Sequence, residues 1–335
     1  MRALVLDGEP GIDHLSVVNR PVVEPAAGQV AVTMKAASLN YRDLATVDSP
    51  MIKARLPLIP LSDGCGVVSA IGAGVKRVAV GDRVAPLFFQ DWFGGEPTAA
   101  GLSTALGGAL DGVARDQVVL SENGVSKVPA ALSDEEVACL PCAGLTAWRA
   151  LMVEGGLKPG DVVLALGTGG VSIFALQFAK AAGATVIITS SSDEKLERAR
   201  ALGADHTINY KTDPDWARAA RKLTGGRGVD HVIEVGGAGT FQQSIQAIRV
   251  GGHVAVIGVL TGMSNDVNVA SIFGANARVH GITVGSREQF EDMCRAIEAN
   301  GVKPVIDKRF PLEDAQAAFR SMRAGEHFGK IVLTF

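Results

Sequence analysis

The sequence predicts an α/β protein that combines a doubly wound parallel sheet with a separate antiparallel β domain. Up to about Leu120 the chain consists of short apolar runs broken by glycine and proline, a pattern typical of antiparallel strands. From Ser133 onward, helical and strand patterns alternate, which indicates a parallel sheet with helices on both faces. A chain of 335 residues also exceeds the usual size of one hydrophobic core and fits two domains.

The composition fits a globular protein and argues against several classes of partner. Hydrophobic residues make up 47% of the chain and charged residues 20%, which argues against disorder. The net charge is -3 and no long run of Lys and Arg occurs, so nucleic acid is not expected as a partner. The four cysteines are sparse, which favours a reducing, cytoplasmic location. Residues 1–9 lack the apolar core of a signal peptide and predict a first strand.

The antiparallel domain is expected to contain strands at both ends of the chain. Early apolar runs begin at Gln29, Gly66 and Asp82. Residues 88–116 are rich in Gly, Ala and Thr with little periodicity, so we expect a long surface loop there. The apolar run at residues 329–333 predicts a last strand that could rejoin the first domain.

The alternating half begins with a helix, because Ser133 and Glu136 have the spacing of a capping box. Strands are then expected at residues 162–166, 185–189, 231–235 and 252–258, and helices at residues 171–182 and 195–202. Residues 162–179 carry no charge and approach the length of a membrane span. The glycines in their middle favour a strand, a tight turn and a helix instead, so no membrane partner is expected.

The turn at residues 166–172, Leu-Gly-Thr-Gly-Gly-Val-Ser, indicates a dinucleotide site. Glycine is needed where the chain turns tightly and where backbone approaches a pyrophosphate, and a helix N-terminus supplies unpaired N–H groups. Ser172 holds the third position of G-x-G-x-x-G and is small enough for close packing of the helix on the strand. A plain strand-helix turn is the alternative, but the flanking strand, the amphipathic helix and the βαβ continuation favour the dinucleotide.

The end of the second strand in such a unit decides between NAD and NADP. Here residues 189–195 read Thr-Ser-Ser-Ser-Asp-Glu-Lys. An acid in place of Ser190 would bind the ribose diol and repel a 2′-phosphate, whereas the hydroxyls of Ser190 and Ser191 followed by Lys195 can accept a phosphate. The sequence therefore favours NADP(H) over NAD(H). Residues 190–193 would also cap the next helix well, and both roles can hold together.

Short segments throughout the chain match one known family in order and spacing. Besides the glycine turn, they are residues 39–44, 59–68, 81–84, 142–148, 257–259 and 329–333. Through them the chain resembles the medium-chain dehydrogenase/reductase superfamily, especially its zinc-free quinone oxidoreductase-like and alcohol dehydrogenase-like branch. The resemblance implies a GroES-like substrate domain formed by residues 1–123 and 286–335. It implies a Rossmann dinucleotide-binding domain formed by residues 124–285.

Cofactor contacts are expected from the glycine turn, from the second strand and from the resemblance. The residues are Thr146, Gly167, Gly169, Gly170, Val171, Ser190, Ser191, Lys195, Tyr210, Gly236, Ile257, Gly258, Val259 and Lys330. In NADP(H)-using relatives, the lysine matching Lys195 and the tyrosine matching Tyr210 reach the 2′-phosphate. Relatives also pair the last strand of the sheet across a two-fold axis, so residues 278–284 predict the edge of a homodimer.

The departures from the family pattern concern metal ligands. Zinc-using relatives have a cysteine near the position of Asn40 and a His-Glu pair where this chain has Ser62-Asp63, so only Cys142 keeps a possible ligand. Residues 88–116 lack the four cysteines that surround a structural zinc in relatives, and we expect no bound zinc. Cys139 and Cys142 have CxxC spacing but no second Cys/His pair, which favours buried structural cysteines. The six scattered histidines are expected to be core or surface residues.

Hydride transfer is the expected chemistry, with the cofactor carrying the hydride and the protein positioning an acceptor. Without a Lewis acid an alkoxide is not stabilised, so we expect reduction of quinones or of activated C=C or carbonyl compounds. Candidate polar residues are Asn40, Tyr41, Asp43 and Asp63, although Asn40 and Asp43 could simply hold a turn. Tyr41 is a candidate proton donor, and water is the default donor. The donor tyrosine of enoyl reductase-like relatives is absent from this chain, because Met51 stands near its place. Activity on alcohols and ketones, or a catalytically lapsed NADP(H)-binding sensor, are the alternatives.

Overall fold

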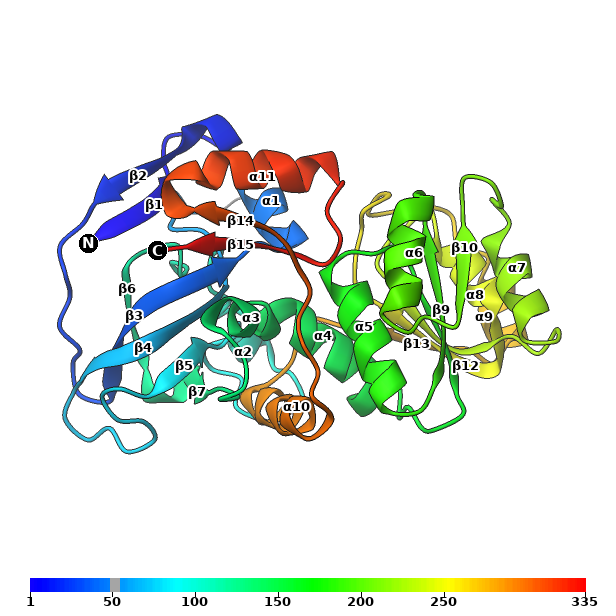
Figure 1. Cartoon of the computed structure of the whole chain (residues 1–335), viewed down its shortest axis with the longest axis horizontal. Coiled ribbons are helices and arrows are strands. Elements are labelled where there is room, and N and C mark those ends of the chain that lie inside the picture. The colour runs from blue at the N-terminus through cyan, green and yellow to red at the C-terminus, as the bar shows by residue number, and fades with distance from the viewer. Residues whose placement is uncertain (49–54) are drawn as a thin grey trace. The chain divides into compact units, whose positions relative to one another are not determined.

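The computed structural model describes residues 1–48 and 55–335 and divides the chain into two compact units (Figure 1). The first unit comprises Met1–Leu145 and Val284–Phe335, and the second unit comprises Thr146–Thr283. Residues 124–145, which the sequence analysis assigns to the dinucleotide-binding domain, therefore lie in the first unit. Within the described residues, no helix is long and apolar enough to cross a membrane.

The first unit is built on a seven-stranded sheet with the order β14-β15-β3-β4-β5-β7, with β6 paired to β3. Its strands are β3 (Gln29–Ser38), β4 (Asp63–Ile71), β5 (Arg83–Pro86), β6 (Gln117–Ser121), β7 (Val125–Lys127), β14 (Ile306–Pro311) and β15 (Lys330–Thr334). A separate antiparallel pair consists of β1 (Arg2–Leu6) and β2 (Leu15–Asn19). β15 pairs antiparallel with β3, with Val332 opposite Ser38, so the C-terminal strand does rejoin the first domain.

Helices cover this sheet, and one of them explains the position of residues 124–145. They are α1 (Tyr41–Asp48), α2 (Ala99–Leu102), α3 (Asp134–Ala138), α10 (Arg287–Asn300) and α11 (Ala315–Ala324). The predicted capping box is present at the start of α3, because the Ser133 hydroxyl accepts from Glu136 N and the Glu136 carboxylate accepts from Ser133 N. α3 packs on β3 and β4, and Ser38 Oγ donates to Ala138 O at 2.8 Å.

Residues 88–116 form only in part the surface loop that the sequence predicts, because residues 93–96 and 98–100 are exposed whereas the start of the segment is buried. Phe88, Phe89, Trp92 and Leu106 are all buried, and α2 lies within the segment. The rings of Phe88 and Phe89 meet edge to face with centroids 4.7 Å apart, and Leu106 N donates to Phe88 O. The aromatic residues at its start therefore anchor this segment on the unit, and its glycine-rich composition hides that packing.

The second unit is a six-stranded parallel sheet with the order β10-β9-β8-β11-β12-β13. Its strands are β8 (Val162–Ala165), β9 (Thr185–Ser190), β10 (His206–Asn209), β11 (Val229–Glu234), β12 (Ile248–Val256) and β13 (Arg278–Gly281). Counted from β8 this is the order 3-2-1-4-5-6 of the Rossmann fold, which reverses direction between β8 and β11. The predicted strands and helices of this half are thus confirmed, with small shifts at their ends.

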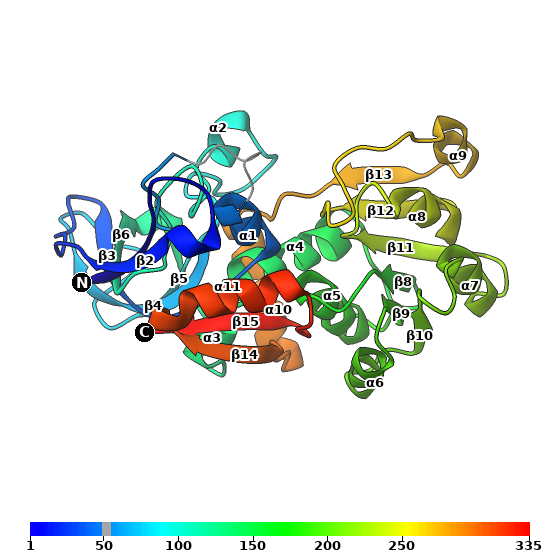
Figure 2. The same ribbon diagram turned by 90° about the horizontal axis from the view of Figure 1, so that it is seen from above.

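Helices lie on both faces of this sheet (Figures 1 and 2). α5 (Gly170–Ala181) and α6 (Asp193–Ala201) pack on β8, β9 and β10 on one face, and α7 (Trp216–Leu223) and α8 (Phe241–Ala247) lie on the other. α4 (Leu145–Trp148) lies at the boundary of the two units, and α9 (Val269–Gly274) follows β12. Fully buried apolar residues such as Leu164, Ile187 and Val232 fill the space between the sheet and the helices.

Candidate functional site

The glycine turn of the second unit has the geometry that a pyrophosphate requires. Gly167 has a φ of 73°, a conformation that residues with a side chain rarely adopt. Gly169 is the N-cap of α5, and a Cβ added there would meet no atom within 4 Å, so a ligand could approach this backbone closely. Gly170 and Val171 form the first turn of α5, whose N-terminal N–H groups and dipole favour an anion.

Ser172 takes over the packing role of the third glycine in this motif. Its side chain is buried, and its Oγ donates to Leu166 O at 2.6 Å. The start of α5 is thereby tied to the end of β8 by a hydrogen bond that a glycine could not make. Gly167 N in turn donates to Thr189 Oγ1 at 3.1 Å, which fixes the turn against β9.

The ends of β9 and β10 bring the predicted phosphate-binding residues together. Asn209 pairs with Ser190 in the parallel ladder, and Tyr210 N donates to Ser190 O at 3.1 Å. Ser190 Oγ accepts from Ser192 N, and Ser192 is the residue that caps α6, with its Oγ accepting from Lys195 N. Helix capping therefore falls to Ser192 and leaves Ser190 beside the exposed side chain of Tyr210.

The predicted contact residues Gly236, Ile257, Gly258 and Val259 lie in the two loops that follow β11 and β12. Ile257 N and Gly258 N both donate to the backbone oxygen of Glu234, at 2.8 and 3.2 Å. A Cβ on Gly258 would lie 2.2 Å from Val235 O, so only glycine fits between these loops. Both loops leave the carboxyl edge of the sheet, where Rossmann folds bind dinucleotides. Of the two remaining predicted residues of this unit, Thr146 is buried at its first position and Ser191 is half-buried between β9 and α6.

The first unit contains a buried polar cluster formed by Asn40, Asp43, Asp63 and Lys330. Lys330 Nζ donates to Leu39 O at 2.6 Å and to Asn40 Oδ1 at 2.5 Å. Asn40 N donates to Asp43 Oδ2 at 2.8 Å. Three of the four candidate residues named from the sequence are thus brought together with Lys330, which the sequence assigns to the cofactor.

Asp63 joins this cluster to the segment that carries Cys142. Its Oδ1 accepts from Ser62 Oγ at 2.6 Å, and its Oδ2 accepts from Cys142 N at 2.8 Å. The side chains of Asp43 and Asp63 are both completely buried. The fourth candidate, Tyr41, begins α1, is 47% exposed and makes no hydrogen bond to the cluster within the described residues. Met51 lies outside the described residues.

Burial dominates the electrostatics of the two carboxyl groups. It raises the pKa of Asp43 to about 6, against the opposing effect of the Arg42 guanidinium, and the charge of Asp63 raises it further. Burial also raises the pKa of Asp63, although Lys330 and the hydrogen bond from Ser62 act in the other direction. Arg42 is held by Leu106 O and Gly107 O at 2.7 and 3.1 Å.

The side chains at the position of the catalytic zinc in relatives do not form a zinc-ligand set. The amide oxygen of Asn40 faces the ammonium group of Lys330, and the hydroxyl of Ser62 donates to Asp63. Burial, and then the charge of Asp63, raise the pKa of the Cys142 thiol. Within residues 1–48 and 55–335, no group of three or more His, Cys, Asp or Glu side chains could hold a metal ion.

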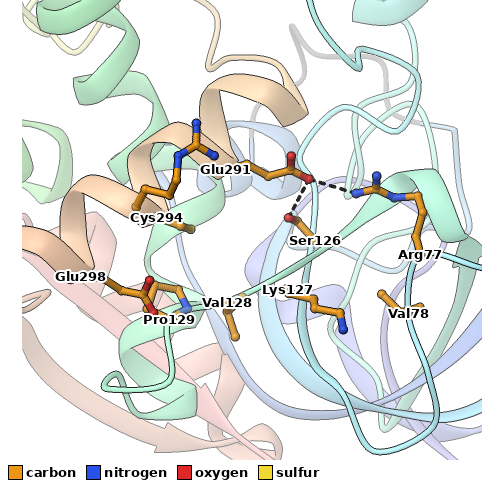
Figure 3. A pocket seen from close by; sticks show the side chains of 10 residues that line it. Arg77, Val78, Ser126, Lys127, Val128, Pro129, Glu291, Cys294 and Glu298 are labelled. Atoms are coloured by element: carbon orange, nitrogen blue, oxygen red, sulfur yellow. Dashed lines mark hydrogen bonds and ion pairs between the residues drawn. The ribbon is translucent and has the colours of Figure 1, made fainter.

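A separate pocket of about 400 Å³ lies between β7 and α10 in the first unit (Figure 3). Glu291 accepts from Arg77 Nη2 at 2.9 Å and from Ser126 Oγ at 3.2 Å. Lys127 pairs with Asp82, and burial raises the pKa of the Cys294 thiol to about 12. The cationic side chains of this pocket are therefore paired and the thiolate form of its cysteine is disfavoured, and none of the predicted site residues lines it.

Sequence reasoning missed two groups of buried polar residues in the second unit. Glu234, at the end of β11, accepts hydrogen bonds from the loop that follows it. His231, His253 and His280 stand on the adjacent strands β11, β12 and β13, with neighbouring ring centroids 5.6 and 5.2 Å apart. Strand alternation alone predicts core histidines, but their contact depends on the register between strands.

The sequence matches two protein families along its length. Residues 26–130 match the family described as Alcohol dehydrogenase GroES-like domain, and residues 170–299 match the family described as Zinc-binding dehydrogenase. A zinc-type alcohol dehydrogenase-like protein of Schizosaccharomyces pombe is 45% identical over 99% of both chains. A 2-haloacrylate reductase of a Burkholderia species is 30% identical over 99% of this chain and 98% of its own.

Solved structures resemble the whole chain as well. A Sinorhizobium meliloti protein described as a possible alcohol dehydrogenase superposes with a TM-score of 0.92 at 41% identity, covering 100% of this chain and 98% of its own. An NAD-dependent alcohol dehydrogenase superposes with a TM-score of 0.90 at 37% identity, covering 100% of both chains. A mycobacterial protein in complex with NADPH superposes with a TM-score of 0.84 at 28% identity, also over 100% of both chains.

Proposed function

Because the chain belongs to the medium-chain dehydrogenase/reductase superfamily, we propose that it reduces quinones or activated C=C and carbonyl compounds with NADPH and without zinc. Relatives that are named as dehydrogenases and reductases support the broader class, which is an NAD(P)-dependent oxidoreductase. The bound nicotinamide supplies the hydride, and this chain's residues bind and orient the reactants.

The hydrogen bond from Lys330 to Asn40 is the observation that carries the proposal. Asn40 stands near the position where zinc-using relatives have a cysteine ligand, and its oxygen already accepts from an ammonium group at 2.5 Å. An alcohol bound there would have no Lewis acid to stabilise its alkoxide. An electron-poor carbon needs less help, because conjugation spreads the charge that arrives with the hydride. The 2-haloacrylate reductase among the relatives acts on a substrate of this kind.

Lys330 also determines which way the amide of Asn40 points. An ammonium group has donors only, so the amide oxygen must face it and the Nδ2 group must face away. Nδ2 is buried and makes no hydrogen bond of good geometry to the described residues; its contact with Asp63 is a weak hydrogen bond that lowers the pKa of that carboxyl. A buried donor without a partner costs free energy, which binding of an acceptor oxygen would recover. We therefore assign Asn40 to the binding of a carbonyl or quinone oxygen.

Turnover with a panel of acceptors tests the reaction. We expect the purified protein to oxidise NADPH with quinones or enones and to oxidise simple alcohols with NADP⁺ slowly or not at all. Cofactor binding without turnover of any acceptor would favour a lapsed sensor. Tyr41→Phe separates the proton donors: because Tyr41 is exposed on α1, we expect an unchanged rate and water as the donor.

The cofactor preference rests on the ends of β9 and β10. Solved relatives include one with NADPH and one that is NAD-dependent, so the family alone does not decide between them. Tyr210 N donates to Ser190 O, the side chain of Tyr210 is exposed, and Lys195 lies in the first turn of α6. A charge-assisted hydrogen bond to the 2′-phosphate should give NADPH about tenfold tighter binding than NADH. Fluorescence titration checks this, and Ser190→Asp should move the preference toward NADH.

A homodimer through the sheet edge is the expected assembly. β13 is the last strand of the six-stranded sheet, and Val279 on it is exposed. On α9, which follows β12, Val269 and Phe273 are 68% and 73% exposed. An apolar strand edge of this kind favours association with a second copy. Light scattering of the wild type should report a dimer at micromolar concentration, and Val279→Lys should shift it toward the monomer.

A further inference from the structure

We infer that Glu234 is a positioning residue for the nicotinamide half of the cofactor. Its carboxylate holds the loop of residues 235–240, here called the Glu234 loop, in the conformation that forms one wall of the dinucleotide site. The inference rests on NAD(P) dependence, which the family supports, and it does not depend on the proposed preference for NADPH or on the proposed acceptors.

The carboxylate of Glu234 is the point on which the Glu234 loop converges. Its Oε1 accepts from Gly236 N at 2.7 Å, from Gly237 N at 2.9 Å and from Thr240 Oγ1 at 2.6 Å. Its Oε2 accepts from the hydroxyl of Ser244 in α8. The side chain is completely buried, and a buried carboxylate is retained only where donors of this kind compensate for lost water.

The two successive glycine N–H groups show why the loop depends on this anion. Gly236 N and Gly237 N both point at one oxygen, which is the arrangement of an anion-binding nest, and Gly237 has a φ of 89°. A Cβ on Gly236 would lie 2.2 Å from Thr240 Oγ1, so the turn is also too tight for a side chain. Without the carboxylate, both N–H groups would be left without an acceptor.

The same residue also fixes the loop that follows β12. The backbone oxygen of Glu234 accepts from Ile257 N and Gly258 N. Thr261 bridges back to the Glu234 loop, because its N and Oγ1 both donate to Gly236 O, at 2.7 and 2.9 Å. The conformation of the second loop is therefore coupled to that of the first.

The position of Glu234 in the sheet determines which half of the cofactor it affects. A Rossmann sheet consists of two mononucleotide-binding halves that meet where the strand order reverses, here between β8 and β11. Gly167 and Ser190 follow β8 and β9 and belong to the adenosine half. Glu234 ends β11, the first strand of the other half, so its loops border the nicotinamide mononucleotide.

Asp230 provides a matched control on the same strand. It is also buried, and it accepts from Val162 N at 2.9 Å, from Arg227 at 2.6 and 2.9 Å and from Arg249 Nε at 2.5 Å. It lies at the amino end of β11, however, whereas Rossmann folds bind ligands at the carboxyl ends of their strands. A carboxylate that only stabilises the fold should behave alike at both ends.

The test compares Glu234→Ala, Glu234→Gln and Asp230→Ala in the full-length protein, each at a temperature where it is folded. We measure the Kd of NADPH by fluorescence and the Kd of adenosine 2′,5′-bisphosphate, the adenosine half alone, by calorimetry. Glu234→Ala should weaken the binding of NADPH about tenfold and leave the Kd of the bisphosphate unchanged, because only the nicotinamide half loses its contact with the Glu234 loop. Glu234→Gln should restore most of the affinity, since its amide oxygen can still accept from Gly236 N and Gly237 N.

Hydrogen exchange gives a second readout that a purely structural role would not produce. In Glu234→Ala the peptide that contains Gly236 and Gly237 should exchange faster, and bound NADPH should restore less protection than in the wild type. If Glu234→Ala does not fold, Thr240→Val removes one donor to the same oxygen and should weaken NADPH about twofold to threefold.

Two results would overturn the inference: equal weakening of NADPH and of the bisphosphate, or an effect of Asp230→Ala on NADPH as large as that of Glu234→Ala. If the wild type binds NADH better than NADPH, the proposed cofactor preference fails, and the same comparison is made with NADH and AMP. If no acceptor is turned over, the proposed reaction fails, and the binding measurements still decide the role of Glu234.

Discussion

The buried carboxyl groups of the two units are perturbed in opposite directions. In the first unit, burial raises the pKa of Asp43 to about 6 and also raises that of Asp63. In the second unit, burial acts the same way on Asp230, but hydrogen bonds from Arg227 and Arg249 outweigh it and lower the pKa. Asp161 behaves like Asp230, because hydrogen bonds from Lys158 and His231 lower its pKa against the effect of burial.

The difference separates groups that maintain the fold from groups that are available for chemistry. A carboxylate enclosed by guanidinium groups is stabilised in its charged form and contributes to the sheet of the second unit. Asp43 and Asp63 lie in a site that disfavours the charged form of their carboxyl groups. Shifted pKa values of this kind are concentrated at functional sites. The cluster with Asn40 and Lys330 is therefore where we expect substitutions to change both stability and activity.

Lys330→Met should have the largest effect, because it removes the ammonium group that faces both carboxyl groups. Lys330 makes no ion pair with Asp43 or Asp63 among the described residues, but its charge acts on both. Removing the opposite charge from buried carboxylates costs up to about 3–5 kcal/mol, and urea unfolding at pH 8 should show a loss in this direction. Activity should fall as well, since the amide of Asn40 is no longer oriented. Lys127→Met is the control: this lysine is 62% exposed and pairs with Asp82, so its loss should cost less than about 1 kcal/mol. Equal losses of unfolding free energy in the two variants would contradict the distinction between the buried and the exposed lysine.

Asp43→Asn should reveal the cost of the buried charge in the first unit. The folded-state pKa of about 6 lies above the ordinary aspartate value of 3.8, so stability from this group is present below pH 3.8 and lost as the pH rises through 6. Asparagine cannot ionise and can still accept from Asn40 N. As the pH rises from 4 to 7, the free energy of unfolding of the variant should therefore increase relative to that of the wild type by up to about 3 kcal/mol. A difference that stays constant across this range would contradict the account.

His253 should give the opposite pH dependence in the second unit. Burial, and then the neighbouring His231, His280 and Arg278, lower its pKa from 6.5 to about 3, so the folded state holds it neutral. The unfolded chain binds the proton first, and stability should fall by up to about 1.4 kcal/mol per pH unit below 6.5. His253→Phe should reduce this slope in thermal unfolding between pH 6.5 and 5. A wild-type slope in His253→Phe would rule out the assignment.

Features that depend on local spacing could be predicted from the sequence, and features that join distant residues could not. The glycine turn at Gly167 and the serine at the end of β9 are recognisable because a strand, a turn and a helix follow one another directly. The contact between Lys330 and Asn40 joins residues 290 positions apart, and no local pattern indicates it. The packing of Phe88 was hidden by the glycine-rich segment that follows it.

Glu234 lies between these two cases. Its partners are only 2 to 10 residues away, but they are two backbone N–H groups and two hydroxyls whose convergence depends on the loop conformation. The sequence shows a strand that ends in an acid before two glycines, which predicts a turn and not an anion-centred loop. The histidines of β11, β12 and β13 required the strand register in the same way.

The most direct test of the central claim is the rate of NADPH oxidation by an enone or quinone after dialysis of the protein against a zinc chelator. The account predicts the same rate before and after dialysis, because Asn40 stands near the position of a cysteine ligand in zinc-using relatives and its oxygen accepts from Lys330 instead. It also predicts that ethanol with NADP⁺ remains the slower reaction. A rate that falls on chelation and returns with added zinc, or faster turnover of ethanol than of any enone or quinone, would contradict it.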